Sequence, residues 1–388
     1  MTEDDVSMTA NTSKSRCVMN NGLPGAGKAA SIFNDYAADA SQMVDLGNLH
    51  DKVKSWFLRT ELDTLMGEPQ GHAEEVARDW LAVGGRRWRP FLAVSVFVAL
   101  QPDEDVQTAS MIQKIAVAVE CFHKASLVHD DIEDGDLERY GKPTLCGEYG
   151  VPIALNVGDV LIGEGYRLLA DSGLDGERVR AAVAEASGAQ RLLCRGQGAE
   201  LSWSHKPCSL SSHHVLEIFR LKTAPAFDVA LQLGAIAAGR AHDFSDVLRA
   251  YSDAVGVAYQ IKDDLDDLVD DSGLMRDATS RPSVVISLAA ERAQGDDRTM
   301  LVGLATGKSN ADITAHHVRA AIRVSKADAE AVLLLEHYKE RAIRALDELN
   351  DQTLKGLLGH SVARILNELA SEAMVESKNE GTGSETSH

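Results

Sequence analysis

Apolar residues recur at helical spacing over most of the chain. The stretch 109–134 has no glycine or proline, and the stretch 244–268 places its apolar residues on one broad face. Further stretches with the same spacing are 44–66, 91–100, 154–170, 178–201, 213–239 and 328–374. Strand-like alternation is scarce. The pattern therefore predicts an all-α protein, a single large helical bundle built around long central helices.

The two ends of the chain lack this pattern. Residues 1–40 and 376–388 are polar, so we expect a flexible leader, a helical domain over 41–375 and a flexible tail. The leader contains "GLPGAGKA" (22–29), which has Gly22, Gly27 and Lys28 of a P-loop. Ala29 stands where that motif needs a hydroxyl, and no apolar strand precedes it. We interpret this segment as part of the flexible leader rather than as a nucleotide site.

Composition limits the kinds of partner. The formal net charge of −20 over 388 residues argues against nucleic acid, because phosphate backbones attract basic surfaces. The five cysteines form no CxxC pair, which indicates neither a zinc site nor a disulfide framework. The longest apolar run, 91–100, is too short to span a bilayer, and the acidic N-terminus does not resemble a signal peptide. We therefore expect a cytoplasmic protein with no membrane span.

Two acidic motifs with the same DDxxD spacing lie far apart in the chain. The first comprises Asp130, Asp131 and Asp134, and the second comprises Asp263, Asp264 and Asp267. Residues at positions i and i+4 share a helix face, and carboxylate oxygens with free coordination positions suit magnesium. Each motif closes a long apolar helix, where the helix dipole disfavours negative charge and a cation is wanted. Either motif alone also fits a solvated helix end, but the pair predicts one site for a diphosphate and several metal ions.

Basic residues supply a complement to these acids. Arg86, Arg87 and Arg89 come just before Pro90, a residue favoured in the first turn of a helix, and they suit a second anion. Lys222 and Thr223 precede Pro225, which would free a backbone carbonyl upstream. Taken alone, the arginine segment fits a surface basic turn better than an anion site. The segment at Lys222 fits an ordinary kinked helix as well as it fits a cation site. Their combination with the acidic motifs indicates a diphosphate site.

The whole set resembles the trans-polyprenyl diphosphate synthase family over about residues 45–375. The resemblance implies the isoprenoid synthase type of all-α fold, a helical bundle around a central cavity. It implies that a homodimer condenses isopentenyl diphosphate with an allylic diphosphate, using magnesium, with three ions per site. By the same match the six aspartates bind metal, and "GQGAEL" (196–201) corresponds to a family motif with Glu200 in place of aspartate.

The resemblance also assigns substrate-binding and catalytic residues. Those matching the isopentenyl diphosphate site are Gly85, Arg86, Arg89 and His123. Those matching the allylic diphosphate site and its catalytic groups are Arg139, Lys222, Thr223 and Gln260, with Arg281 in place of a lysine. One position departs from the family. Tyr140 replaces an arginine expected on isopentenyl diphosphate, and a neutral phenol cannot supply that charge.

The departure at Tyr140 leaves open a non-catalytic or altered-substrate subunit. A class I terpene synthase is a further alternative, although "DDLDD" (263–267) does not match its second metal motif. The resemblance also bears on product length. Ala125 and Ser126, five and four residues before Asp130, are small, and Phe122 lies about two turns below the motif. We predict that Phe122 closes the cavity near C20, giving geranylgeranyl diphosphate, with a longer product as the alternative.

Overall fold

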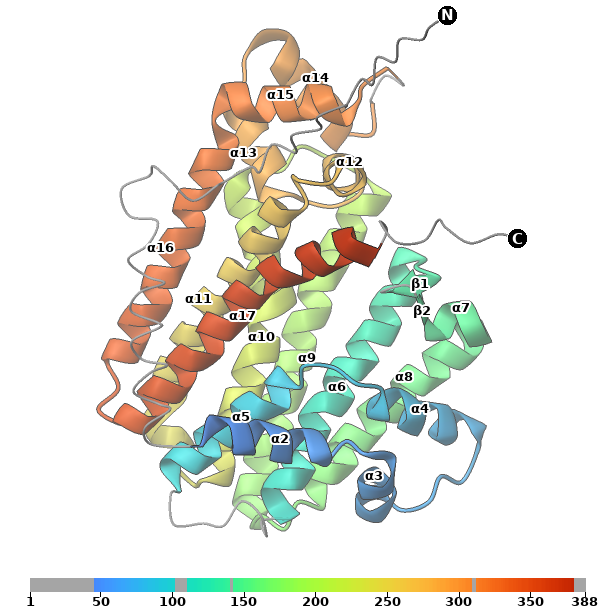
Figure 1. Cartoon of the computed structure of the whole chain (residues 1–388), viewed down its shortest axis with the longest axis vertical. Helices are drawn as coiled ribbons and strands as arrows, with labels where there is room; N and C mark the ends of the chain where they lie inside the picture. The colour runs from blue at the N-terminus through green and yellow to red at the C-terminus, as the bar shows by residue number, and fades with distance from the viewer. Residues whose placement is uncertain (1–44, 102–109, 140–141, 309–311, 380–388) are drawn as a thin grey trace, which may run out of the picture.

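The computed structural model describes residues 45–101, 110–139, 142–308 and 312–379. The described chain is almost entirely helical, which confirms the predicted all-α class (Figure 1). The glycine-rich segment 22–29 and Tyr140 lie outside the described residues. None of the helices within the described ranges is long and apolar enough to cross a membrane.

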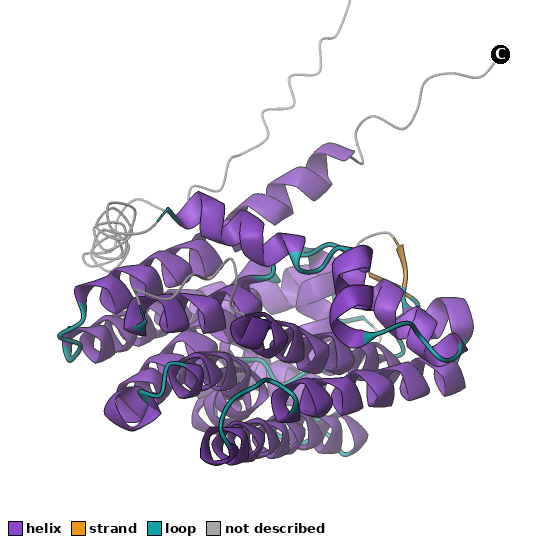
Figure 2. Ribbon diagram, turned by 90° about the horizontal axis from the view of Figure 1, so that it is seen from below, coloured by secondary structure: helices purple, strands orange, loops and turns teal. Residues whose placement is uncertain are grey.

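Five long helices form the centre of the molecule. They are Ser110–Asp134 (α6), Val151–Ala170 (α8), Gly176–His205 (α9), Ser212–Ala237 (α10) and Ala241–Asp266 (α11). In Figure 1 these helices run side by side, with α6 against α8, and α10 between α9 and α11. Figure 2 shows the same bundle from below. Long uninterrupted helices are favoured here because buried apolar faces, rather than local propensity, supply most of their stability.

The other helices cover the ends and the sides of this centre. The N-terminal helices are Leu46–Ser55 (α2), Arg59–Met66 (α3), His72–Ala82 (α4) and Trp88–Leu100 (α5). The remaining ones are Leu145–Tyr149 (α7), Asp271–Thr279 (α12), Val284–Arg292 (α13), Gly295–Ala305 (α14), Ala315–Ser325 (α15), Ala327–Asp347 (α16) and Gln352–Asn379 (α17). A small antiparallel pair, Glu138–Arg139 (β1) and Lys142–Pro143 (β2), follows α6.

Two predicted helices are each divided in the structure. The stretch 44–66 forms α2 and α3, separated by a turn in which Trp56 and Phe57 are buried. The stretch 328–374 forms α16 and α17, because Asp351 begins a new helix by accepting the amide of Leu354 at 2.8 Å. An aspartate at this position is a common helix start, and periodicity alone did not reveal it. The division lets α17 cross the front of the bundle (Figure 1).

Glycines allow the central helices to approach closely near the predicted site. A Cβ atom added at Gly196 of α9 would lie 2.4 Å from the backbone nitrogen of Lys222 on α10. One added at Gly256 of α11 would lie 2.5 Å from the Cα of Ala224. Atoms at such distances overlap, so only glycine fits at both positions. The backbone of α10 around Lys222 is therefore held between two neighbouring helices.

Candidate active site

The two acidic motifs face the same positive groups. Burial raises the pKa of both Asp130 and Asp263, and the charge of Lys222 on α10 opposes both rises. Arg281, just before α13, lies 3.5 Å from Asp134 and also opposes the rise in the pKa of Asp263. Charges act strongly only over short distances in water, so the carboxyl ends of α6 and α11 share one space. The structure brings together the two motifs that the sequence separates.

Burial and neighbouring acidic groups disfavour the charged form of these carboxylates. Burial raises the pKa of Asp130 to about 6, a rise that Lys222 opposes and Glu133 reinforces. Burial also raises the pKa of Asp263, with a further contribution from Asp267. Negative groups gathered in this way at helix C-termini are stabilised by cations. The outer aspartates of both motifs therefore fit divalent metal ions.

The middle aspartate of each motif has a different partner. Asp131 is 1% exposed, and its Oδ1 accepts from Nε of Arg139 at 2.8 Å and lies 2.6 Å from Nη2. Asp264 accepts the amides of Val284 at 2.6 Å and Val285 at 3.2 Å, in the first turn of α13. Asp131 and Asp264 therefore have partners within the protein that the sequence did not indicate, and the binding of metal by all six aspartates stays a prediction.

One buried carboxylate oxygen in the first acidic motif fits a bound cation. The second oxygen of Asp131 is buried and has no hydrogen-bond partner within the described part of the chain. A carboxylate oxygen in that state is costly unless something positive reaches it. Among the described residues no three histidine, cysteine or acidic side chains enclose a metal position by themselves.

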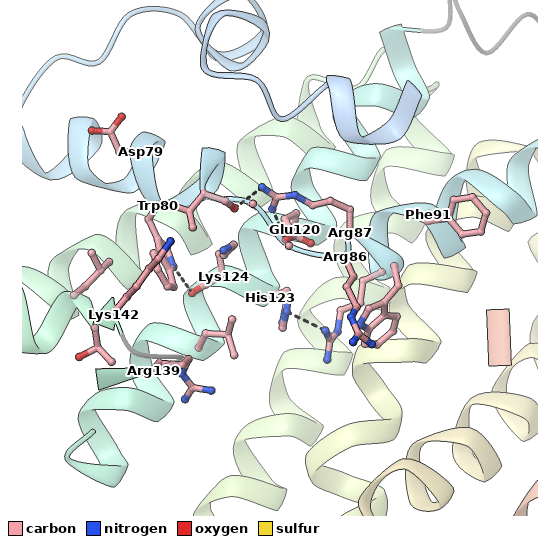
Figure 3. Close-up of a pocket in the computed structure, with 18 of the residues that line it drawn as sticks. Asp79, Trp80, Arg86, Arg87, Phe91, Glu120, His123, Lys124, Arg139 and Lys142 are labelled. Atoms are coloured by element: carbon pink, nitrogen blue, oxygen red, sulfur yellow. Dashed lines mark hydrogen bonds and ion pairs between the residues drawn. The ribbon is translucent and has the colours of Figure 1, made fainter. Parts of the chain in front are cut away.

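A basic cavity of about 780 Å³ lies on the other side of Arg139 (Figure 3). The predicted residues Gly85, Arg86, Arg89, His123 and Arg139 all line it. Further basic residues along its wall are Arg87, Lys124, Lys142 and Arg364. The six aspartates are absent from its lining residues, so the cavity and the acidic helix ends are two adjacent sites. Arg139 belongs to the cavity wall and is bonded to the first acidic motif.

Arg89 and His123 form the centre of the cavity. Nη1 of Arg89 lies 2.9 Å from Nε2 of His123, and its guanidinium stacks 3.9 Å above the ring of Trp88. Burial lowers the pKa of Arg89 to about 10, and burial together with Arg89 holds the pKa of His123 well below its usual value. The neutral imidazole accepts from Arg89, so this arginine stays oriented toward the cavity.

Arg87 has a structural role. Its backbone has a φ of 53°, in the left-handed region, where it begins α5. Its buried side chain lies 2.5 Å from Glu120 and donates to the carbonyls of Leu81 and Val83, each at 2.7 Å. These bonds stabilise an otherwise unfavourable turn. The sequence pattern grouped Arg87 with the anion site, whereas the structure uses it to fix the loop that carries Arg86 and Arg89.

The remaining predicted residues lie on α10 and α11. Nζ of Lys222 lies 2.5 Å from Glu200 of α9, and Thr223 next to it is buried. Pro225 lies inside α10 without ending the helix. Gln260 precedes Asp263 on α11 by less than one turn. Among these residues, Lys222 acts on the charges of both acidic motifs, through Asp130 and Asp263.

Several cavity residues were not identified from sequence. Trp80 lies on α4, a helix that no predicted stretch covered. Lys142 follows the first acidic motif, and Lys124, a lysine inside the apolar stretch 109–134, was a signal that could have been used. Arg364 gave no such signal, because only the crossing of α17 brings it to the cavity. Long-range packing of this kind has no signature in local periodicity.

An all-α bundle with acidic helix ends beside a basic cavity has two kinds of group that suit a diphosphate: carboxylates for metal ions and basic side chains for the anion. The family model described as polyprenyl synthetase matches residues 70–322. The chain therefore belongs to the polyprenyl synthetase family, a family of trans-prenyltransferases. This membership agrees with the resemblance drawn from the motifs.

Individual relatives support the same family. A short chain isoprenyl diphosphate synthase from Methanocaldococcus jannaschii is 31% identical over 192 residues, 49% of this chain and 56% of that protein. Another from Methanothermobacter thermautotrophicus is 27% identical over 304 residues, 77% of this chain and 90% of that protein. The nonaprenyl diphosphate synthase of Mycobacterium tuberculosis is 28% identical over 338 residues, 83% of this chain and 96% of that protein.

Solved structures share the fold. A geranylgeranyl pyrophosphate synthetase from Pyrococcus horikoshii superposes with a TM-score of 0.71 at 23% identity, covering 84% of this chain and 99% of that one. A geranylgeranyl pyrophosphate synthase from Corynebacterium glutamicum, solved with isoprenyl diphosphate and magnesium, gives 0.68 at 23% identity, covering 83% and 98%. These matches confirm the predicted bundle.

Proposed function

We propose that the chain condenses isopentenyl diphosphate with an allylic diphosphate, head to tail, and releases a longer allylic diphosphate. The observation that carries this proposal is the presence of two different anion sites joined at Arg139. One is an acidic pair of helix ends suited to metal and diphosphate, and the other is a basic cavity. Two diphosphate substrates that must react with each other need two such sites side by side.

The basic cavity is the proposed site for isopentenyl diphosphate. Arg86, Arg89 and His123 supply donors on one wall, and Arg139 supplies another between the two sites. Guanidinium groups match phosphate oxygens in pairs, so they fix orientation as well as charge. Because Arg89 is bonded to neutral His123 before substrate arrives, little reorganisation is needed when it binds.

The acidic helix ends are the proposed site for the allylic diphosphate. Asp130, Asp134, Asp263 and Asp267 would hold magnesium, and the resemblance to the family implies three ions. Bound magnesium supplies charge neutralisation for the departing diphosphate. Arg281 and Lys222 add positive charge beside the same carboxylates.

The chain's own residues then position the reacting atoms and keep water out. The carbon–oxygen bond of the allylic diphosphate breaks, and the double bond of isopentenyl diphosphate attacks the resulting cation. A proton leaves the new chain, and the released diphosphate accepts it. In this proposal Thr223 of α10 and Gln260 of α11 act beside the reacting atoms. The close packing of α9, α10 and α11 at Gly196 and Gly256 supports it, because it fixes the helices that carry both residues.

The proposed product is geranylgeranyl diphosphate. Phe122, Ser126 and Asp130 follow one another at four-residue intervals along α6. The ring of Phe122 meets Tyr166 of α8 edge-on at 5.0 Å, and the Tyr166 hydroxyl donates to Gln190 of α9 at 2.7 Å. The contacts among Phe122, Tyr166 and Gln190 join three helices and support Phe122 as the residue that closes the cavity. Between Phe122 and the acidic motif, the small side chains of Ala125 and Ser126 leave space for the substrate chain.

The test is a product assay with purified protein, magnesium and labelled isopentenyl diphosphate. Each of the C5, C10 and C15 allylic diphosphates is supplied in turn, and the products are sized. We expect elongation that stops at C20. Failure to elongate all three primers would contradict the proposal and favour a non-catalytic subunit.

We also propose that the chain forms a homodimer through α8 and α9. Val151 and Leu155 of α8 are each 48% exposed, and Leu192 of α9 is 36% exposed. Apolar side chains gathered on adjacent helices favour burial against another surface. Sedimentation analysis of the full chain would give twice the chain mass, whereas a monomer at micromolar concentration would contradict the proposal.

A further inference from the structure

Lys124 lies on the cavity face of α6. Glu120, His123, Lys124 and Leu127 follow one another at helical spacing, and all four line the cavity. Lys124 is 5% exposed, and its Nζ lies 4.3 Å from the centre of the Trp80 ring. A lysine buried to this degree normally has a carboxylate partner.

The carboxylate near Lys124, that of Glu120, already has an ion-pair partner. Glu120, one turn earlier on α6, lies 2.5 Å from Arg87 and is almost fully buried with it. Lys124 itself makes no ion pair with any acidic side chain in the described ranges, and its ammonium group lies over the face of Trp80. Burial lowers the pKa of Lys124 to about 8, Glu120 opposes that change, and Arg87 adds to it. The arrangement leaves a positive group in need of an anion.

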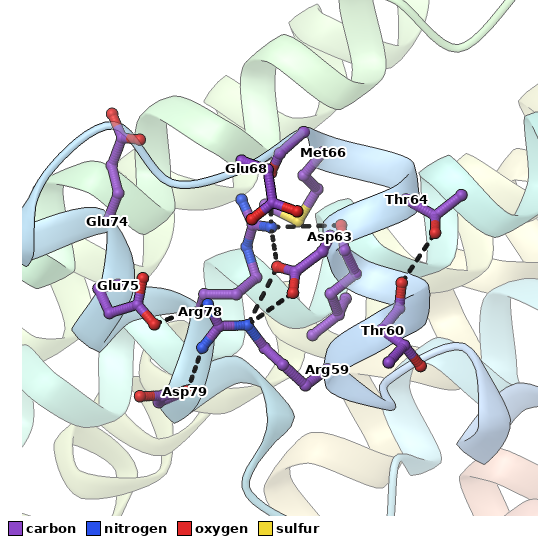
Figure 4. A network of polar contacts seen from close by, with 12 residues as sticks. Arg59, Thr60, Asp63, Thr64, Met66, Glu68, Glu74, Glu75, Arg78 and Asp79 are labelled. Carbon is purple, nitrogen blue, oxygen red and sulfur yellow. Dashed lines mark hydrogen bonds and ion pairs between the residues drawn. The ribbon is translucent and has the colours of Figure 1, made fainter.

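Trp80 holds the ammonium in place beside the cavity. Its Nε1 donates to the backbone carbonyl of Lys124 at 3.3 Å, so the indole is tied to α6. The helix that carries Trp80, α4, is braced against α3 by the ion-pair network in Figure 4, in which Arg59 binds Asp63, Glu75 and Asp79. The position of Lys124 is therefore built by the fold and is not a loose surface conformation.

We propose that Lys124 binds the diphosphate of isopentenyl diphosphate, together with Arg86, Arg89 and His123, and that Trp80 positions it. Figure 3 shows Lys124 and His123 on the same helix, facing the same cavity. An ammonium group offers three donors and a compact charge, which suits a phosphate oxygen. This inference rests on the proposed function, and it supplies a cation in a chain whose Tyr140 cannot provide one.

The test compares the KM values of the two substrates. Lys124→Met keeps the length of the side chain and removes its charge. We expect the KM for isopentenyl diphosphate to rise at least about tenfold, because the charged contact is lost, while the KM for the allylic diphosphate stays within about twofold. Lys124→Arg retains the charge and should recover most of the affinity.

Matched controls separate binding from folding. Lys114 lies on the same helix and pairs with Asp171 at the surface, so Lys114→Met should leave both KM values unchanged. Thermal unfolding shows whether Lys124→Met folds, and titration calorimetry with isopentenyl diphosphate alone measures its binding directly. Trp80→Leu should weaken the same binding, and Trp80→Phe should preserve most of it.

The outcomes distinguish this inference from the proposed function. An active wild-type enzyme whose Lys124→Met variant keeps the KM and the calorimetric affinity for isopentenyl diphosphate would overturn the role of Lys124. Equal losses for both substrates would also overturn it, because they indicate a general structural effect. Absence of prenyl transfer in the wild-type protein would instead contradict the proposed function.

Discussion

The middle and outer aspartates of each acidic motif have different tasks. Among the outer ones, Asp130, Asp134 and Asp263 lie near Lys222 or Arg281, and Asp267 lies 3.5 Å from Arg276. Of the middle ones, Asp131 is bonded to Arg139 and Asp264 accepts amides in the first turn of α13. The DDxxD spacing could be identified from sequence because it is local. The partners of Asp131 and Asp264 could not, since they depend on the path of the chain after each helix.

Substitution at Asp263 and Asp264 should separate catalysis from stability. Asp264→Ala removes two hydrogen bonds from the first turn of α13 and should lower the free energy of unfolding by about 2 kcal/mol. Asp263→Ala should change it by less than about 0.5 kcal/mol while abolishing turnover. Urea unfolding and a prenyl transfer assay measure the two effects. Equal stability of both variants would contradict the capping role.

Lys124 should make the stability of the protein depend on pH. Its pKa falls from an ordinary 10.5 to about 8 on folding, so between these values the unfolded chain binds the proton and the folded chain does not. The contribution of Lys124 to stability therefore rises with pH across that window, and the cost of the buried charge is fully present below pH 8.

Removing the charge of Lys124 should remove the free-energy cost of burying it. Lys124→Met should raise the free energy of unfolding at neutral pH by roughly 1–3 kcal/mol, after the loss of the contact with Trp80 is included. The gain should shrink as the pH approaches 10.5, the ordinary value of the lysine. Urea unfolding at several pH values measures it. A difference between variant and wild type that stays constant with pH would contradict this account.

At the scale of the elements, helix contacts set the position of the catalytic groups. Gly196 lets α9 touch the backbone of α10 at Lys222, so Gly196→Ala should force the helices apart. We expect a loss of about 1–3 kcal/mol in the free energy of unfolding and a lower kcat. Gly198→Ala, on the same helix with open space around it, should be neutral or slightly stabilising. If Gly196→Ala and Gly198→Ala had the same free energy of unfolding and the same kcat, the close contact between α9 and α10 would not position Lys222.

The contact between α6 and α8 should set product length. A Cβ at Gly165 would lie 2.6 Å from the ring of Phe122, so this glycine seats the ring beside Tyr166. Phe122→Ala should open the space below and shift the product beyond C20. Gly165→Ala should displace the ring and broaden the product range, while Gly163→Ala, with open space around it, should not. An unchanged product from Phe122→Ala would show that the floor lies elsewhere.

The sequence predicted the positions of individual helices more accurately than it predicted how those helices pack together. Both helices that carry the acidic motifs were identified within a few residues of their ends, because periodicity and the absence of helix breakers are local properties. The left-handed turn at Arg87 was not predicted, since it is stabilised by Glu120, 33 positions later in the chain, together with the carbonyls of Leu81 and Val83. Arg364 reaches the cavity only through the packing of α17.

At the scale of the whole molecule, the fold places two anion sites side by side. The acidic site lies between α6, α10 and α11, and the basic cavity lies between α4, α6 and α17. Arg139 joins them through its bond to Asp131. One helix, α6, contributes side chains to both sites, so in the proposed reaction the two substrates meet across it. The central claim is that both acidic motifs act on one diphosphate.

Calorimetric binding of an unreactive allylic diphosphate analogue, with and without magnesium, tests that claim most directly. The measurement compares wild type, Asp130→Ala, Asp263→Ala and the double variant. If one cluster of magnesium and diphosphate spans both helix ends, either single change should remove most of the magnesium-dependent affinity, and the second change should add little. Independent, additive losses, or retention of full affinity after one change, would show that the two motifs do not share a ligand.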